Sequence, residues 1–114
     1  MKFTSDRAFQ LWAYSVSHAQ LLIRSPIDAQ HSQNLDVAFF GVHRMNLISG
    51  FVGVEIDEVD AVGARRPMRR FVLRSGGRQV GEIDAADIRI SENGLDRNET
   101  DLPHFIVRSV ELTS

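Results

Sequence analysis

Cysteine is missing from the 114 residues of the chain, which excludes a disulfide, a thiolate metal site and a cysteine nucleophile. No stretch approaches the ~20 consecutive apolar residues that a membrane-spanning helix needs. The first ten residues, MKFTSDRAFQ, also lack the apolar segment of a secretory signal. We therefore expect a cytoplasmic protein whose fold stands without covalent cross-links.

Lysine is nearly absent as well, since Lys2 is its single copy and every other basic residue is arginine. The remaining composition is ordinary, with 43% hydrophobic and 25% charged residues and a net charge of -2. A chain of this length suits one domain with its own core. We predict a single domain over residues 1–114.

The segment from Ala8 to Val16 fits two patterns, an alternating strand and an amphipathic helix that Ser5 would cap. We favour the strand because its aromatic and β-branched residues suit a pleated surface, and because the next apolar run, residues 20–24, has the length of a strand. Together the two runs predict a hairpin that turns near residues 17–19 and ends at Pro26. In the first strand, one face would carry Phe9, Leu11 and Ala13, and the other Trp12, Tyr14 and Val16.

Several further short runs alternate or are bounded by turn residues, and they predict additional strands. In residues 51–59 we expect Val52, Val54 and Ile56 to face inward, and Gly76-Gly77 predicts a tight hairpin turn. The predicted strands lie at residues 35–40, 42–47, 51–59, the two arms of 69–83, 85–90 and 104–112. This pattern is typical of an all-β fold, either an antiparallel β-sandwich or a small open barrel of about eight or nine short strands with little helix.

Six arginines and no acidic residue lie between residues 61 and 81; they are Arg65, Arg66, Arg69, Arg70, Arg74 and Arg78. Arginine suits phosphate and carboxylate, so Arg65, Arg66, Arg69 and Arg70 are candidates for binding an anion or a partner. The preceding strand, however, carries acidic residues that would lie opposite them in an antiparallel pair; they are Glu55, Asp57, Glu58 and Asp60. We expect such cross-strand pairs, worth about 0.2–1 kcal/mol each, to occupy the arginines, and we do not expect nucleic acid to bind.

Ser17 and His18 would be a nucleophile and a base only if their side chains converged, but neighbours in a strand point to opposite faces. No acyl-transfer motif surrounds them. We predict no catalytic residue. An alternative is a ligand pocket inside a barrel, for which His18, Arg24 and His43 are the candidate residues.

Metal and cofactor motifs are missing. The histidines other than His18 stand alone, without metal-ligand spacing; they are His31, His43 and His104. A calcium loop starting at Asp96 would need glycine at its sixth position and glutamate at its twelfth, where the chain has Asp101 and Val107. Gly76-Gly77 is not followed by the lysine and helix of a phosphate loop. We predict neither a metal nor a cofactor.

Apolar residues occupy both faces of residues 12–14 and 38–40, which indicates more buried surface than one small sheet covers. In a homodimer, the contact between two copies would bury this additional apolar surface. Our leading hypothesis is a non-catalytic binding or self-association module. The alternatives are a ligand-binding or enzymatic barrel with a pocket near His18 and Arg24, and an anion or nucleic-acid binder acting through Arg65 to Arg78.

Overall fold

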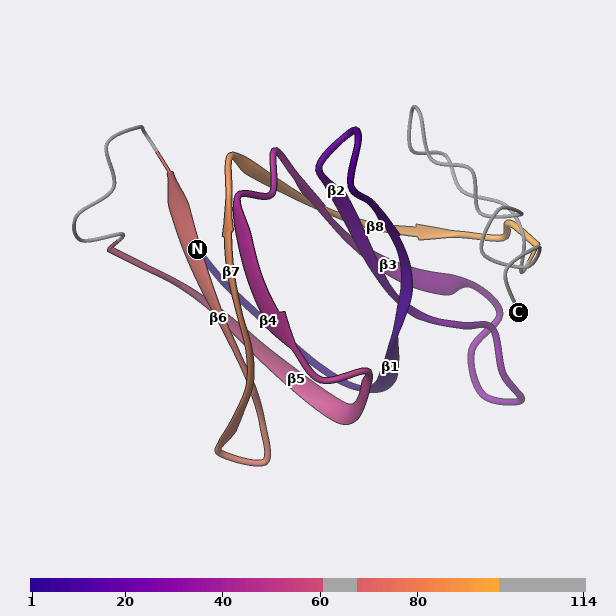
Figure 1. The fold of residues 1–114 in the computed structure, drawn as a ribbon. Helices are drawn as coiled ribbons and strands as arrows, with labels where there is room; N and C mark the ends of the chain where they lie inside the picture. Colours follow the sequence, from indigo (N-terminus) through magenta and orange to yellow (C-terminus); the bar gives the residue numbers. More distant parts are fainter. Residues whose placement is uncertain (61–67, 97–114) are drawn as a thin grey trace.

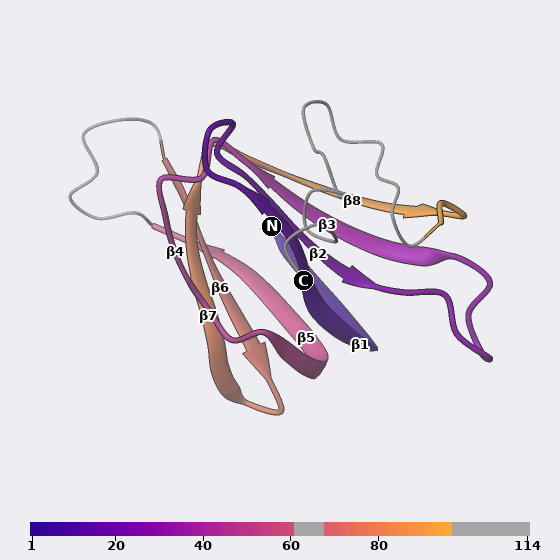
Figure 2. The ribbon, with the colours of Figure 1, turned by 45° about the vertical axis from the view of Figure 1, so that its right-hand side comes forward.

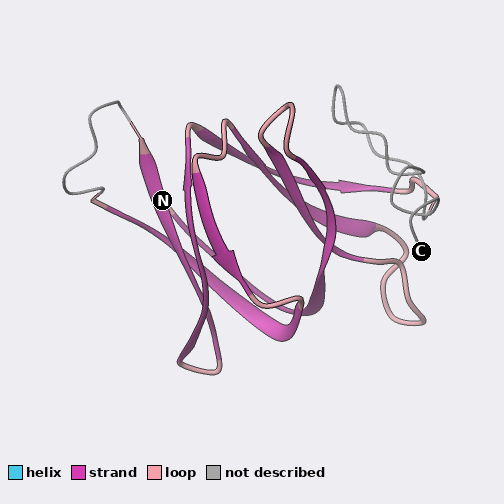
Figure 3. Ribbon diagram, in the orientation of Figure 1, coloured by secondary structure: helices cyan, strands magenta, loops and turns pink. Residues whose placement is uncertain are grey.

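The computed structural model describes residues 1–60 and 68–96, and all regular structure in these residues is strand (Figure 1, Figure 3). No helix in this part of the chain is long and apolar enough to cross a membrane. The predicted all-β class is confirmed, while the strand predicted at 104–112 lies outside the described residues. The strands are β1 (Lys2–Ser15), β2 (Gln20–Ser25), β3 (Asn34–Phe40), β4 (Arg44–Leu47), β5 (Gly50–Val59), β6 (Arg69–Ser75), β7 (Arg78–Ala85) and β8 (Asp87–Asn93).

The eight strands form one antiparallel sheet in the order β4-β7-β6-β5-β1-β2-β3-β8. The sheet folds over itself because β1 belongs to both of its halves. Residues 2–10 of β1 pair with β5, and residues 10–15 pair with β2. Figure 2 shows the two halves as layers that diverge from one corner, with β4 to β7 in one layer and β2, β3 and β8 in the other.

A second corner joins the two halves where β3 turns into β4 and β7 turns into β8. The backbone continues to pair through this bend, since Ala86 N donates to Phe40 O at 2.9 Å and His43 N donates to Asp84 O at 2.8 Å. Gly41 forms the bend with a φ of +63°, and a Cβ placed there would lie 2.8 Å from the Cβ of Ala86. Both the backbone angle and the close approach require glycine at this position.

The main core fills the space between the two halves. Phe39 of β3 meets Phe71 of β6 edge to face, with ring centroids 5.5 Å apart. The buried cluster around these rings draws on both halves; it includes Phe9, Leu21, Ile23, Val37, Phe51, Val54, Ile56, Leu73 and Ile83. Leu35, Val37 and Phe39 all belong to this cluster, because alternate residues of a strand point to the same face.

Two irregularities overturn the simple alternation predicted for β1 and β5. Val52 is 74% exposed rather than inward, because Gly53 adopts a φ of +77° and the β1–β5 register shifts beside it. The β1–β2 register shifts between Leu11 and Ala13, so that Ala13 leaves the face of Phe9 and packs with Trp12 in a second cluster. Bulges of this kind re-aim side chains and cannot be predicted from alternation.

The predicted turns are confirmed. The turn between β1 and β2 covers residues 16–19, and β2 ends at Ser25 before Pro26. Gly76 and Gly77 have φ angles of +59° and +79° and connect the paired residues Ser75 and Arg78. Both angles are those that a primed hairpin turn requires.

Candidate functional site

A buried ion pair lies on the outer face of the β2–β3 half, away from the main core. Arg24 is 0% exposed and is the largest fully buried side chain of the described residues. It donates from Nε and Nη2 to the two carboxylate oxygens of Asp36 at 2.6 and 2.9 Å. The two residues are direct cross-strand partners in β2 and β3, which places the planar guanidinium in line with the carboxylate.

Trp12 covers this ion pair. The guanidinium carbon of Arg24 lies 5.3 Å from the centroid of the Trp12 ring, a distance at which the cation and the aromatic ring attract each other. Trp12 and Phe40 also pack against a small apolar cluster on the same face, formed by Ala13, Leu22 and Ala38. The outer face of this half is therefore a second packed layer with a charge pair inside it.

Asn34, at the start of β3, connects three separate segments. Its Oδ1 accepts from the backbone N of Ile27 at 2.9 Å, and its Nδ2 donates to Asn93 Oδ1 at 3.0 Å and to Leu95 O at 2.8 Å. Asn93 in turn donates to Asp36 Oδ2 at 2.8 Å. These contacts link the end of β8 to the buried ion pair.

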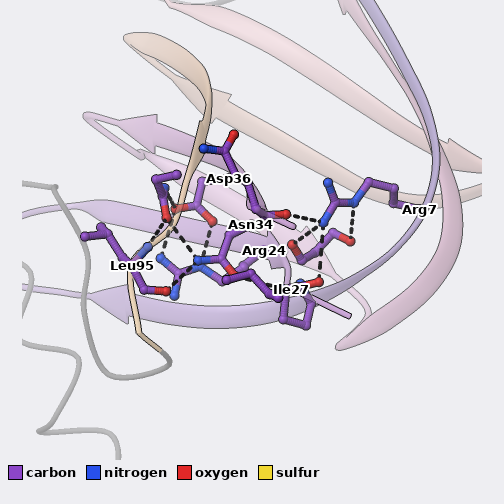
Figure 4. A network of polar contacts seen from close by, with 10 residues as sticks. Arg7, Arg24, Ile27, Asn34, Asp36 and Leu95 are labelled. Carbon is purple, nitrogen blue, oxygen red and sulfur yellow. Dashed lines mark hydrogen bonds and ion pairs between the residues drawn. The ribbon is translucent and has the colours of Figure 1, made fainter. Parts of the chain in front are cut away.

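Arg7 fixes the opposite end of the same network, as Figure 4 shows with Arg7 at one end and Leu95 at the other. Its guanidinium donates to the carbonyl oxygens of Ser25, Pro26 and Gln33 at 3.1, 3.3 and 2.8 Å, and to Ser25 Oγ at 2.9 Å. These contacts hold the two ends of the loop between β2 and β3. Hydrogen bonds thus hold this loop and, through Asn34, the segment from Asn93 to Leu95.

A pocket of about 430 Å³ lies beside this network, and we call it the Trp12 pocket. The described residues that line it come from β1, the loop after β2, β3 and the segment after β8. They are Gln10, Trp12, Pro26, Ile27, Asn34, Leu95 and Asp96. Its volume falls within the range of about 300–1,000 Å³ that is typical of small-molecule sites, and its lining combines apolar surface with a few polar groups.

The predicted ligand residues His18, Arg24 and His43 do not meet in one place. His18 and His43 are exposed in two turns that a hydrogen bond joins, from Val42 N to Ala19 O at 2.9 Å. Arg24 lies at the other end of β2, beneath Trp12. None of the three is among the described residues that line the Trp12 pocket.

Of the predicted anion-binding arginines, Arg65 and Arg66 lie outside the described residues. Arg69 donates to Glu58 at 2.8 Å and to Asp87 at 2.9 Å, and it lies 5.2 Å from the ring centroid of Phe71. Arg70 donates to Asp84 at 2.8 Å. Both described arginines are therefore engaged by carboxylates within the chain, and binding of an external anion remains a prediction.

Basic and carboxylate side chains lie together across the outer face of the other half, and we call this set the ion-pair ladder. It consists of Lys2, Glu55, Asp57, Arg74, Arg70, Glu82, Asp84 and Arg44, from β1 through β5, β6 and β7 to β4. Arg74 lies 3.3 Å from Asp57, Arg70 lies 2.8 Å from Asp84, and Arg44 contacts both Glu82 and Asp84. The predicted pairing of the strand 51–59 with the arginine-rich strand is confirmed by Asp57–Arg74 and by Glu58–Arg69.

These ion pairs change the titration of their members. The hydrogen bonds from Arg70, and after them those from Arg44, lower the pKa of Asp84 against the opposing effect of burial. A hydrogen bond from Arg69 lowers the pKa of Glu58 in the same way. Both carboxylates therefore favour their charged forms.

Sequence patterns missed the residues that build the Trp12 pocket, namely Gln10, Asn34, Asn93 and Arg7. Each is a single polar residue at a strand end or within a strand, and no motif surrounds it. The one signal in the sequence was the charged residues within apolar strands, Arg24 and Asp36, which are costly to bury unless they are paired. No group of three or more histidine or acidic side chains suited to a metal occurs in residues 1–60 and 68–96.

Comparison with known proteins gave no relative: no protein-family model, no curated protein and no solved structure matches the chain. The functional argument therefore depends on the geometry of the site.

Proposed function

We propose that the protein is a non-catalytic binding module that takes a small organic ligand in the Trp12 pocket. The observation that carries this proposal is a pocket of about 430 Å³ whose walls are fixed by the hydrogen bonds of Asn34 and Arg7. A site that is formed before binding loses little conformational freedom when the ligand enters. Among the described lining residues, Asp96 is the only ionisable side chain, which supports binding rather than acid-base chemistry.

Trp12 can report ligand binding directly, because it lines the pocket and is the single tryptophan of the chain. We expect a ring-sized probe such as benzamide, benzamidine or benzoate to change Trp12 fluorescence and shift its indole N–H signal in NMR spectra, with a Kd in the millimolar range. Replacing Ile27, a lining residue that is 46% exposed, with aspartate should weaken this binding. The matched control is Ile48→Asp, since Ile48 is 51% exposed and does not line the pocket. If all three probes leave Trp12 unchanged, the proposal is wrong.

Self-association is a second candidate function, and a different part of β1 favours it. Residues 12–15 lie beyond the end of β5, and in the described residues no strand lies beside them on the side away from β2. Tyr14 in this segment and Val16 in the turn that follows it are 41% and 79% exposed and present apolar surface beside this edge. An open strand edge with apolar side chains can pair with a second copy of the chain.

Light scattering tests this candidate. We expect a dimer that Tyr14→Lys dissociates and that Val52→Lys leaves intact, because Val52 is also exposed but lies on β5. A monomer at high protein concentration would exclude self-association. Both proposals include the cytoplasmic location that we expect from the sequence.

A further inference from the structure

We infer that the ligand of the Trp12 pocket is an uncharged planar ring that carries an amide-like edge, with one hydrogen-bond donor beside one acceptor. This inference rests on the proposed function and specifies the ligand class. It follows from the charges around the pocket, the shape of its walls and the polar groups that remain available to a ligand.

An anion is disfavoured by the charges of the described lining, which include the carboxylate of Asp96 and no cation. The two neighbouring arginines direct their guanidinium groups to acceptors of the protein. Arg24 donates to Asp36, and Arg7 donates to main-chain carbonyl oxygens of the loop. A carboxylate or phosphate would lose its hydration in the pocket without gaining an ion pair from these residues.

A cation is disfavoured because Arg24 already places its charge 5.3 Å from the centroid of the Trp12 ring. A second cation against the same indole would be repelled by the first, and the carboxylate of Asp36 offsets part of this repulsion. The carboxylate of Asp96 would attract a cation, so the benzamidine titration described below decides which of the two effects dominates. An uncharged ligand avoids both costs.

The apolar part of the lining favours a flat ring. The indole of Trp12 is planar, and Pro26, Ile27 and Leu95 supply the remaining apolar surface. Aromatic side chains contribute stacking energy to rings of any chemistry, so this surface selects shape rather than identity.

Gln10 supplies the polar selectivity. Its side-chain amide has one carbonyl acceptor and one NH₂ donor group, and it makes no hydrogen bond with the other described residues. The amide of Asn34 is fully occupied by contrast, by Ile27, Asn93 and Leu95. Gln10 can therefore pair with a donor and an acceptor that lie side by side on a carboxamide, a lactam or a nucleobase.

The experiment compares three probes that share ring and shape and differ in charge, namely neutral benzamide, cationic benzamidine and anionic benzoate. The indole N–H signal of Trp12 is followed during each titration of the full chain. We expect benzamide to bind most tightly, with benzoate weaker by about tenfold or more. A higher affinity for benzamidine or benzoate would overturn the inference and leave the proposed function standing, whereas no change with any probe would overturn the proposed function itself.

A charge substitution tests the role of Gln10. In Gln10→Glu the carboxylate no longer matches an amide edge and instead suits the two donors of an amidinium, so the preference should change from benzamide to benzamidine. Gln79→Glu is the matched control, because Gln79 is exposed on β7 and does not line the pocket. It should keep the preference for benzamide. If Gln10→Glu also keeps that preference, Gln10 does not select the ligand and the inference fails.

Discussion

The two halves of the sheet carry arginine–carboxylate pairs on their outer faces, yet the pairs differ in burial. In the ion-pair ladder the side chains of Arg74 and Asp57 are 40% and 25% exposed, whereas those of Arg24 and Asp36 are 0% and 4% exposed. Water screens an exposed pair such as Arg74–Asp57, so such a pair contributes little to the free energy of unfolding. In a buried pair such as Arg24–Asp36, removing one partner destabilises the fold because the other charge stays buried. The comparison indicates that the ladder maintains a solvated surface, while the buried pair organises the face that holds the Trp12 pocket.

The largest effect is expected from Asp36→Asn, which removes the carboxylate that binds the buried guanidinium of Arg24. We expect a loss of about 3–5 kcal/mol in the free energy of unfolding, measured by urea denaturation. The double variant Arg24→Met/Asp36→Leu should recover most of this loss because it removes both charges. A loss below about 1 kcal/mol in the single variant would show that this buried pair contributes no more to stability than an exposed pair of the ladder.

The corner that joins the two halves should be the next most sensitive position. Gly41→Ala places a Cβ at 2.8 Å from that of Ala86 and also strains a φ of +63°. We expect a loss of about 2–3 kcal/mol in the same denaturation assay. Gly76→Ala is the control, since its φ of +59° is similar but a Cβ there meets nothing within 4 Å. Equal losses at both glycines would show that the close approach to Ala86 has no energetic role.

Acid should weaken the ion-pair ladder at Asp84. Because the pKa of Asp84 lies below the ordinary 3.8, its contribution to stability is present above that value and is lost as pH falls through the lowered pKa. Glu58, which pairs with Arg69 outside the ladder, should behave in the same way. Asp84→Asn should cost about 1 kcal/mol at neutral pH and should reduce the acid dependence of the unfolding midpoint. A variant with unchanged acid dependence would contradict this account of Asp84.

The smallest effect is expected from Arg74→Gln, which removes one exposed rung of the ladder. The loss should be about 0–1 kcal/mol and should shrink further in high salt, because exposed ion pairs are screened. Measuring the unfolding free energy at low and high salt checks both points. A loss comparable to that of Asp36→Asn would remove the distinction between the two faces.

The sequence predicted local features well because they depend on neighbouring residues. The Gly76-Gly77 hairpin, the strand end before Pro26 and the acidic strand opposite the arginines all follow from turn chemistry or alternation. The bulges at Gly53 and between Leu11 and Ala13 could not be predicted in this way. They depend on how β1 bends between two partner strands, which is a property of the whole sheet.

The candidate site was harder to predict for the same reason. The Trp12 pocket combines residues from β1, β3 and the segments after β2 and β8, which are distant in the chain. Asn34 is the clearest example, because its role depends on meeting Ile27, Asn93 and Leu95 at once. A single asparagine at a strand start carries no signal of such a role.

A map of backbone amide shifts during a benzamide titration tests the central claim most directly, because it reports on both faces in one sample. We predict that the shifts concentrate at Gln10, Trp12, Asn34 and Leu95 and are absent from Arg44, Arg70 and Arg74. Shifts confined to the ladder, or spread evenly over both halves, would contradict the assignment of binding to the Trp12 pocket.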